Sequence, residues 1–502
     1  MDINTKTVAR GALILFIGLI ISKVLNYIFR AIMARFLGPG DYGLFSLALS
    51  IVSIFGWIAL FGLNQAAERN IPYYNNSKGK VKGVIIAIFK IGIPVGLIIT
   101  AISLLFSEKI SLFLKKENLM LILQIMSFSI ISYSLAEISL ASIRGFKEIK
   151  IFTWIKYIID PLLKIILTVI FLVLGLKITG VSLAYTITSY IILVLSFLIL
   201  KTKIFNWTKI KSQINLNKKI FSFSWPLLFT GILFSAMQWT DTIILGYFKT
   251  EELIGIYNAA IPTAALIWII QASFDSLFIP IMSELQQKNK REEMTRIFNS
   301  ATRWIILLSL PITLILITFS EGILNALFGI AYIPGSLSLK IVAVGVFIGI
   351  SVGPVESLLN VIGKTKIKMI LRAIGLLINI ILNIILIPIY GLAGAAIATA
   401  LSIIVFEVLA YLYLKTKFKT KIFHIKYIYL APILLVICYT LNRLYNPLNI
   451  INTILFILFL LILITITLLI VKIYNKEDIE IIKVIENKLK IKNYISNLLE
   501  KW

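Results

Sequence analysis

Apolar stretches long enough to cross a lipid bilayer recur along nearly the whole of this 502-residue chain. A spanning helix needs about 20 predominantly apolar residues, and fourteen such stretches can be delimited, with no long polar block between them. They cover residues 11–37, 42–65, 82–106, 119–142, 152–174, 178–200, 220–247, 253–282, 297–319, 337–361, 366–388, 392–414, 424–442 and 450–472. We therefore expect an all-α polytopic membrane protein with 14 transmembrane helices.

Composition and cysteine content exclude several other classes of protein. With 59% hydrophobic and only 14% charged residues, the chain has more apolar surface than a soluble protein of this length can bury. The single cysteine, Cys438, excludes a disulfide within the chain, and the single histidine, His424, cannot form a metal site unaided. We expect no cofactor and no metal site.

The distribution of positive charge predicts the orientation of the helices. Cytoplasmic loops of membrane proteins carry an excess of lysine and arginine. With the N-terminus inside, the predicted cytoplasmic segments hold 34 of the 49 basic residues, and the outer loops hold six. This alternation predicts a protein of the cytoplasmic membrane with both termini in the cytoplasm. It also accounts for the net charge of +26 without a nucleic-acid partner.

The chain also repeats itself. The repeated features are Leu200–Lys203 with Leu414–Lys417 and Gly180 with Gly394, both at an offset of 214 residues, and Gly43–Phe45 with Gly255–Tyr257 at an offset of 212. Each half then has six spans, so the two halves share one orientation and are related by a pseudo-two-fold axis along the membrane normal. The alternative is a coincidence of short motifs in a chain rich in isoleucine and leucine.

This repeat predicts the domain organisation. The expected parts are an N-terminal lobe (1–203, helices 1–6), a cytoplasmic linker (204–219), a C-terminal lobe (220–417, helices 7–12), helices 13–14 (418–472) and a cytoplasmic amphipathic tail (473–502). The tail has apolar residues at helical spacing with lysines between them, which suits a helix on an anionic membrane surface. A solvated tail with partial helicity is the alternative.

Positive charges inside the first span are the strongest functional signal. An ionisable side chain at membrane depth costs several kcal/mol, roughly, unless it faces a wet cavity or a partner. Lys23, Asn26 and Arg30 fall on one helical face, and Arg35 lies near the outer interface. Ammonium and guanidinium groups suit a phosphate or pyrophosphate. Alternatively, Arg35 reaches the headgroups and Lys23 pairs with an acid on another helix.

Two further basic residues are assigned to the same substrate pathway. Lys164 follows Lys156 and Asp160 at successive steps of four residues, so it either lines a pathway or pairs structurally. Arg372 lies within the predicted eleventh span, where an unpaired charge would be costly.

Three acids within spans are candidates for coupling transport to an ion gradient. Asp241, Asp275 and Glu356 each have an amide side chain nearby in the sequence. A buried carboxylate beside an amide can bind Na⁺ or a proton. The acids can equally be counter-ions for Lys23 or Arg372.

Several segments resemble Wzx-type polysaccharide flippases. The segment Ala34–Phe45, preceded by Arg30, looks like the signature between the first two helices of that family. Asn64–Tyr73 resembles the end of their second helix, and Asp241–Gly246 with Gly255–Ala260 is similar to their seventh and eighth. The resemblance covers most of the chain. It implies the superfamily of multidrug exporters and the lipid II flippase, with two six-helix lobes around a V-shaped cavity.

Two departures favour the polysaccharide branch of that superfamily. The first span has no acid, unlike many cation-coupled drug exporters, and the second helix lacks the arginine-rich ending of the lipid II type. The leading hypothesis is a flippase for a polyprenyl-linked oligosaccharide, with membrane lipids, a Na⁺ or proton gradient and glycan polymerases or glycosyltransferases as partners. A Na⁺- or proton-coupled drug or metabolite exporter is the alternative. A membrane-embedded glycosyltransferase is disfavoured, because every outer loop is short.

Overall fold

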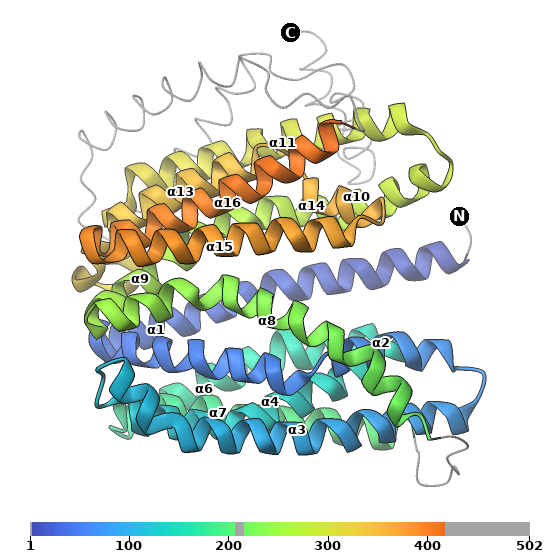
Figure 1. Ribbon diagram of the computed structural model, residues 1–502, viewed down its shortest axis with the longest axis horizontal. Helices are drawn as coiled ribbons and strands as arrows, with labels where there is room; N and C mark the ends of the chain where they lie inside the picture. Colours follow the sequence, from blue (N-terminus) through green and yellow to red (C-terminus); the bar gives the residue numbers. More distant parts are fainter. Residues whose placement is uncertain (1–2, 206–214, 417–502) are drawn as a thin grey trace, which may run out of the picture. The chain divides into compact units, whose positions relative to one another are not determined.

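The computed structural model describes residues 3–205 and 215–416, and all of its regular elements in these ranges are helices (Figure 1). The predicted spans 424–442 and 450–472 and the predicted tail 473–502 lie outside the described residues. The first half contains α1 (Ile3–Leu60), α2 (Leu63–Tyr73), α3 (Lys78–Phe113), α4 (Leu119–Gly145), α5 (Ile149–Thr153), the π-helix η1 (Trp154–Ile159), α6 (Asp160–Val173), α7 (Lys177–Ile199) and the π-helix η2 (Leu200–Ile204).

The second half is also helical throughout its described residues. It contains α8 (Asn217–Phe248), α9 (Glu251–Ala264), the 3₁₀-helix η4 (Ala265–Ile267), α10 (Trp268–Gln287), α11 (Arg291–Thr318), α12 (Ser320–Phe328), the 3₁₀-helix η5 (Ile330–Gly335), α13 (Ser336–Ile350), α14 (Val355–Val361), α15 (Thr365–Tyr390) and α16 (Leu392–Lys415).

The described residues contain ten helices long and apolar enough to cross a membrane. This number is smaller than the prediction for the same region for two reasons. The first two predicted spans belong to one continuous candidate, Ile14–Tyr73, although Gly38 interrupts the helix there with φ +74° and ψ 173°. The fifth predicted span is divided among α5, η1 and α6, because Pro161 lacks the N–H of a regular helix and a π-turn precedes it. The chain is a multi-pass membrane protein.

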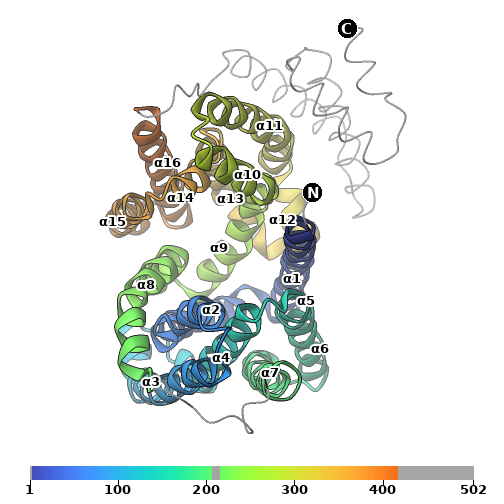
Figure 2. The same ribbon diagram turned by 90° about the vertical axis from the view of Figure 1, so that its right-hand side faces the viewer.

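The chain divides into two compact units, the first formed by Met1–Thr263, Leu327–Ser338 and Arg372–Ser402. Within this unit α4 packs against α1, α3 and α7 (Figure 2). Small hydroxyl residues line these contacts: Ser103 and Ser127 join α3 to α4 at 2.7 Å, and Ser132 joins α4 to Ser189 of α7 at 2.5 Å. Serine permits close approach of membrane helices and hydrogen bonds across them.

The described residues of the second unit lie in Ala264–Ala326, Leu339–Leu371 and 403–416. Its apolar core is drawn from α10, α11, α14 and α16, with Met282, Phe298, Leu358 and Tyr411 almost fully buried. Other large apolar side chains remain exposed, such as Leu105 of the first unit at 77% and Val344 of the second at 39%. Exposed apolar surface on long helices suits a lipid surrounding.

The repeated glycines Gly180 and Gly394 have similar packing environments. A Cβ at Gly394 would lie 2.2 Å from the carbonyl oxygen of Leu386 in the preceding helix. A Cβ at Gly180 would lie 2.8 Å from Cβ of Phe171, which is also in the preceding helix. Each glycine therefore lets one helix start close to the end of the helix before it.

We predict that Gly394→Ala destabilises the protein, because the backbone of α15 blocks the added methyl group. Overpacking of this kind costs about 1–3 kcal/mol, and it should lower the midpoint of thermal unfolding in detergent. Gly322→Ala is the matched control, since nothing lies within 4 Å of a Cβ at Gly322. Equal midpoints for the two variants would contradict the prediction.

Candidate functional site

Asp241 of α8 lies at the centre of a polar cluster inside the first unit. Its Oδ1 accepts hydrogen bonds from the amides of Asn379 (3.0 Å) and Asn383 (2.6 Å) of α15. Its Oδ2 accepts one from the hydroxyl of Tyr257 (2.8 Å) of α9 and one from the hydroxyl of Thr399 of α16. Three other helices thus bring neutral donors to one carboxylate.

Helical periodicity explains how α15 supplies two of these donors. Asn379 and Asn383 are four residues apart, so they lie on the same face of the helix. Both are buried, and the amide of Asn383 also donates to Oδ1 of Asn379 at 3.0 Å. Two asparagines at this spacing in the otherwise apolar stretch 373–390 are the sequence signal that points to the site. Gln238, the amide nearest to Asp241 in the sequence, is not among its hydrogen-bond partners.

The cluster retains one unsatisfied acceptor and an uncompensated charge. Oδ1 of Asn383 is buried and has no hydrogen-bond partner among the described residues. No lysine or arginine of the described ranges forms an ion pair with Asp241. A carboxylate at membrane depth is costly unless a cation or a proton neutralises it. The available ligands are carboxylate, amide and hydroxyl oxygens, which suit a hard cation such as Na⁺.

In the described part of the chain, no group of three or more histidine, cysteine, aspartate or glutamate side chains is close enough to hold a metal ion.

The cationic face of α1 is the second feature of the first unit. Lys23 is exposed and Arg30 is partly buried, and neither forms an ion pair with an acid in the described ranges. Asn26, between them on the same face, donates its amide to the backbone and hydroxyl oxygens of Ser22 at 2.8 and 3.2 Å. The first span therefore presents two cationic groups with no described counter-ion.

Arg35 has a different environment from Lys23 and Arg30. Its Nε donates a hydrogen bond to the carbonyl oxygen of Leu327 at 2.9 Å. Its place on a substrate pathway stays a prediction.

Lys164 lies in a network of two ion pairs within the first unit. Its Nζ is 3.1 Å from the carboxylate of Asp160, and Lys156, four residues before Asp160, pairs with Glu137 of α4. The side chains of Lys164 and Asp160 are each 16% exposed. Lys164 also lies over the ring of Tyr185. Structural pairing is thus present, and a role on the pathway stays a prediction.

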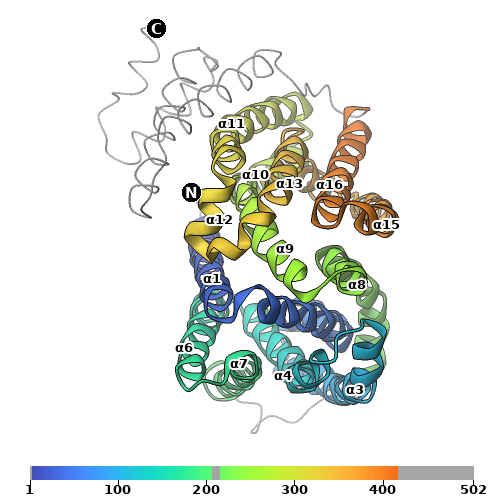
Figure 3. The ribbon, with the colours of Figure 1, turned by 90° about the vertical axis from the view of Figure 1, so that its left-hand side faces the viewer.

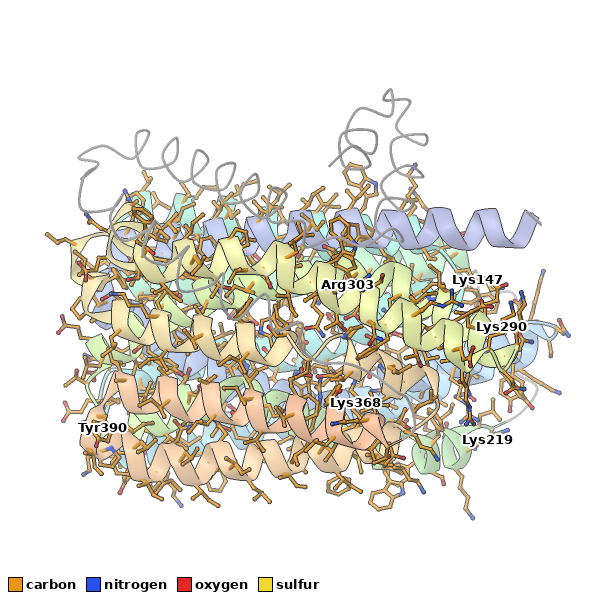
Figure 4. The ribbon with its side chains drawn as sticks, turned by 90° about the horizontal axis from the view of Figure 1, so that it is seen from above. Lys147, Lys219, Lys290, Arg303, Lys368 and Tyr390 are labelled. Atoms are coloured by element: carbon orange, nitrogen blue, oxygen red, sulfur yellow. The ribbon has the colours of Figure 1, made fainter. Side chains whose placement is uncertain are left out.

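The other predicted site residues are distributed over both units. In the second unit, Asp275 accepts a hydrogen bond from Ser357 at 2.6 Å, and Glu356 pairs with Lys368 at 2.9 Å (Lys368 is labelled in Figure 4). Arg372 belongs to the first unit and is partly buried on α15. Of the three predicted coupling acids, Asp241 is the one surrounded by neutral donors from three other helices.

Family models match both halves of the chain. A model described as polysaccharide biosynthesis protein matches residues 8–286, and the MatE model matches residues 226–385. A relative named probable low-salt glycan biosynthesis flippase Agl15, from Haloferax volcanii, is 26% identical over 424 residues, which cover 81% of this chain and 84% of the relative.

Solved structures that share the fold include a flippase and a multidrug transporter. The lipid II flippase MurJ in an inward closed conformation has a TM-score of 0.72 at 22% identity, covering 91% of this chain and 98% of its own. An inward-facing multidrug resistance MATE family transporter has a TM-score of 0.66 at 13% identity, covering 81% and 98%.

We predict that Lys156→Met and Glu137→Gln each destabilise the protein, because each leaves its partner charged and unpaired. The cost should be about 1–3 kcal/mol, whereas the double variant should recover much of it, since it removes both charges. The exposed pair Glu284–Lys288 provides the control, and Lys288→Met should leave the thermal midpoint unchanged. A double variant less stable than both single variants would show that the pair is not the relevant interaction.

Proposed function

Because the chain belongs to the polysaccharide biosynthesis protein family, we propose that it is a flippase for a lipid-linked oligosaccharide. The substrate is a glycan joined to a polyprenyl phosphate or pyrophosphate, and the protein transfers it across the cytoplasmic membrane for polysaccharide or glycan assembly. The name of the relative Agl15 supports this assignment. Glycan polymerases or glycosyltransferases are the proposed partners, and the protein itself performs no covalent chemistry.

The observation that supports the proposal most directly is the cationic face of α1. Lys23 and Arg30 have no acidic partner in the described ranges, so a negatively charged group on a substrate can neutralise them. Phosphate oxygens accept charge-assisted hydrogen bonds from both ammonium and guanidinium groups. The amide nitrogen of Asn26 already donates to Ser22, and its amide oxygen is an uncharged acceptor for a sugar hydroxyl. The polyprenyl tail stays in the lipid.

The proposed topology follows from the loop charges and the repeat. Both termini are cytoplasmic, helices 1–6 and 7–12 form two lobes, and two further helices and an amphipathic tail complete the chain. In such transporters a central site opens to alternate sides of the membrane.

We propose that Asp241 couples transport to Na⁺ or to protons. The amide orientations of asparagine are assigned from hydrogen bonding, so a rotation of the Asn383 amide would direct its unsatisfied Oδ1 toward Asp241. The carboxylate, the two amide oxygens and the Thr399 hydroxyl would then be oxygen ligands for one Na⁺. A proton on the carboxylate would remove the same uncompensated charge.

The second candidate function is export of a drug or metabolite by the same ion coupling. The MatE match over residues 226–385 includes Asp241, Asn379 and Asn383, and this observation favours it. Exporters of cationic drugs have no use for a cationic face on α1, which is why the flippase is preferred. Drug sensitivity in a deletion strain with unchanged surface glycans would support export instead.

The flippase proposal predicts that replacing Lys23 and Arg30 by alanine slows transfer of a polyprenyl-diphosphate glycan. In vesicles containing purified protein and a fluorescent glycolipid, the double variant should lose at least about 1.4 kcal/mol of transition-state binding, which is a tenfold slower rate. Lys90→Ala is the matched control, because Lys90 is exposed on α3 on the same face as the exposed apolar residues Ile86, Ile93 and Leu97. Wild-type rates for the double variant would refute the role of the α1 face.

Ion coupling predicts that Na⁺ stabilises the folded protein. NaCl replaces KCl at equal ionic strength, with Na⁺ at ten times its dissociation constant. The free energy of unfolding should then rise by about 1.4 kcal/mol, which is measured as a higher thermal midpoint. Asp241→Asn should abolish this increment, and Asp275→Asn should retain it. If the coupled ion is a proton, NaCl has no effect and a pH gradient changes the flipping rate of wild type but not of Asp241→Asn. Insensitivity of the wild type to both ions would contradict coupling at this site.

A further inference from the structure

Two glycines that the sequence repeat pairs, Gly43 of α1 and Gly255 of α9, lie against each other's backbone within the first unit. A Cβ at Gly43 would lie 1.8 Å from the carbonyl oxygen of Glu251 and 2.8 Å from the nitrogen of Gly255. A Cβ at Gly255 would lie 2.0 Å from the carbonyl oxygen of Pro39 and 3.0 Å from the nitrogen of Gly43. No other residue type fits at either position without separating the two segments.

The two contacts are reciprocal. Glu251 follows Pro39 by 212 residues, and Gly255 follows Gly43 by the same 212 residues. Reciprocal contacts between equivalent residues are what a two-fold axis produces where it passes through an interface. The proposed axis between the lobes therefore passes close to these two glycines.

Three further hydrogen bonds to backbone carbonyl oxygens involve residues of the segment Ala34–Phe45. The hydroxyl of Tyr42 donates to Asn258 at 3.2 Å, the hydroxyl of Tyr332 donates to Ala34 at 2.8 Å, and Nε of Arg35 donates to Leu327 at 2.9 Å. Tyr42 and Tyr332 are each 1% exposed, and their rings meet edge to face at 6.3 Å.

These contacts join α1 to α9, to η5 and, through Leu327, to the end of α12, near the break at Gly38. Helices α1 and α9 are labelled in Figure 3. The loop charges place this end of α1 on the outer side of the membrane. The acceptors are carbonyl oxygens, which water can satisfy when the segments separate. The glycine contact depends on shape alone, so it re-forms without any change of protonation or rotamer.

We propose that this latch, composed of Gly43, Gly255, Tyr42, Tyr332 and Arg35, closes the outer end of the transport pathway. The inference rests on the proposed transport function and adds a role for the segment Ala34–Phe45. In the closed state of this structure the two glycines are in contact. In the outward-open state α1 and α9 separate at this point, and the buried side chains behind them become accessible to the outer solution.

The latch predicts that Gly43 and Gly255 both limit the access of reagents in the outer solution to buried residues of α1. Met33 is 2% exposed and lies on α1 near Ala34. With Cys438 replaced by serine, Met33→Cys reports access to a membrane-impermeant maleimide added from outside. Gly43→Ala and Gly255→Ala should each raise the labelling rate about tenfold, because the added methyl group disfavours the closed state. Gly40→Ala is the matched control, since nothing lies within 4 Å of a Cβ at Gly40.

A milder variant keeps the test decisive if the alanine variants do not fold. Tyr332→Phe retains the ring and removes only the hydrogen bond to Ala34, so it should raise labelling about threefold to tenfold, as expected for a bond of about 1 kcal/mol. Labelling equal to that of Gly40→Ala in every folded variant would overturn the latch.

The labelling measurement needs no substrate, so it separates the two proposals. Unchanged labelling together with normal glycolipid transfer would contradict the latch alone. Increased labelling in a protein that transfers no glycolipid would support the latch and contradict the flippase.

Discussion

The absence of water in the bilayer core dictates most of this structure, because each backbone N–H and C=O group there needs a partner inside the protein. The described chain meets this requirement with helices, and it departs from regular helix at few places. At Gly38 the backbone adopts φ +74°, which glycine tolerates, and the chain turns from one arm of α1 to the next. Before Pro161, the π-helix Trp154–Ile159 accommodates the missing donor. Gly38 is three residues from Arg35, and the π-helix contains Lys156.

The same surroundings determine how the charges are arranged. Glu137 with Lys156, and Asp160 with Lys164, neutralise each other within the first unit. Asp241 is held by hydroxyl and amide donors that cannot neutralise it. On α1, Lys23 and Arg30 have no acidic partner among the described residues. An anionic substrate for α1 and a cation for Asp241 would complete both sites, which is how the two proposals complement one another.

Hydropathy predicted most of the described membrane helices, because the cost of exposing polar backbone to lipid acts on each segment separately. The partners of Asp241 could not be predicted in this way. Which face of α15 meets α8 depends on the packing of four helices. The partners of Asp241 are therefore Asn379 and Asn383, which are distant in the sequence, and Gln238, which is near it, is not among them. Likewise, the repeat identified Gly43 and Gly255 as equivalent, but only the folded chain brings them into contact.

The phosphate specificity of the α1 face is the central claim, and a comparison of two lipids tests it most directly. The initial transfer rates of a polyprenyl-diphosphate glycan and of the same glycan on an uncharged polyprenyl carrier would be measured in vesicles of identical composition. Wild type should prefer the charged lipid by at least about tenfold, a difference of about 1.4 kcal/mol, and Lys23→Ala/Arg30→Ala should lose that preference. Equal rates for both lipids in the wild type, or an undiminished preference in the double variant, would contradict the account.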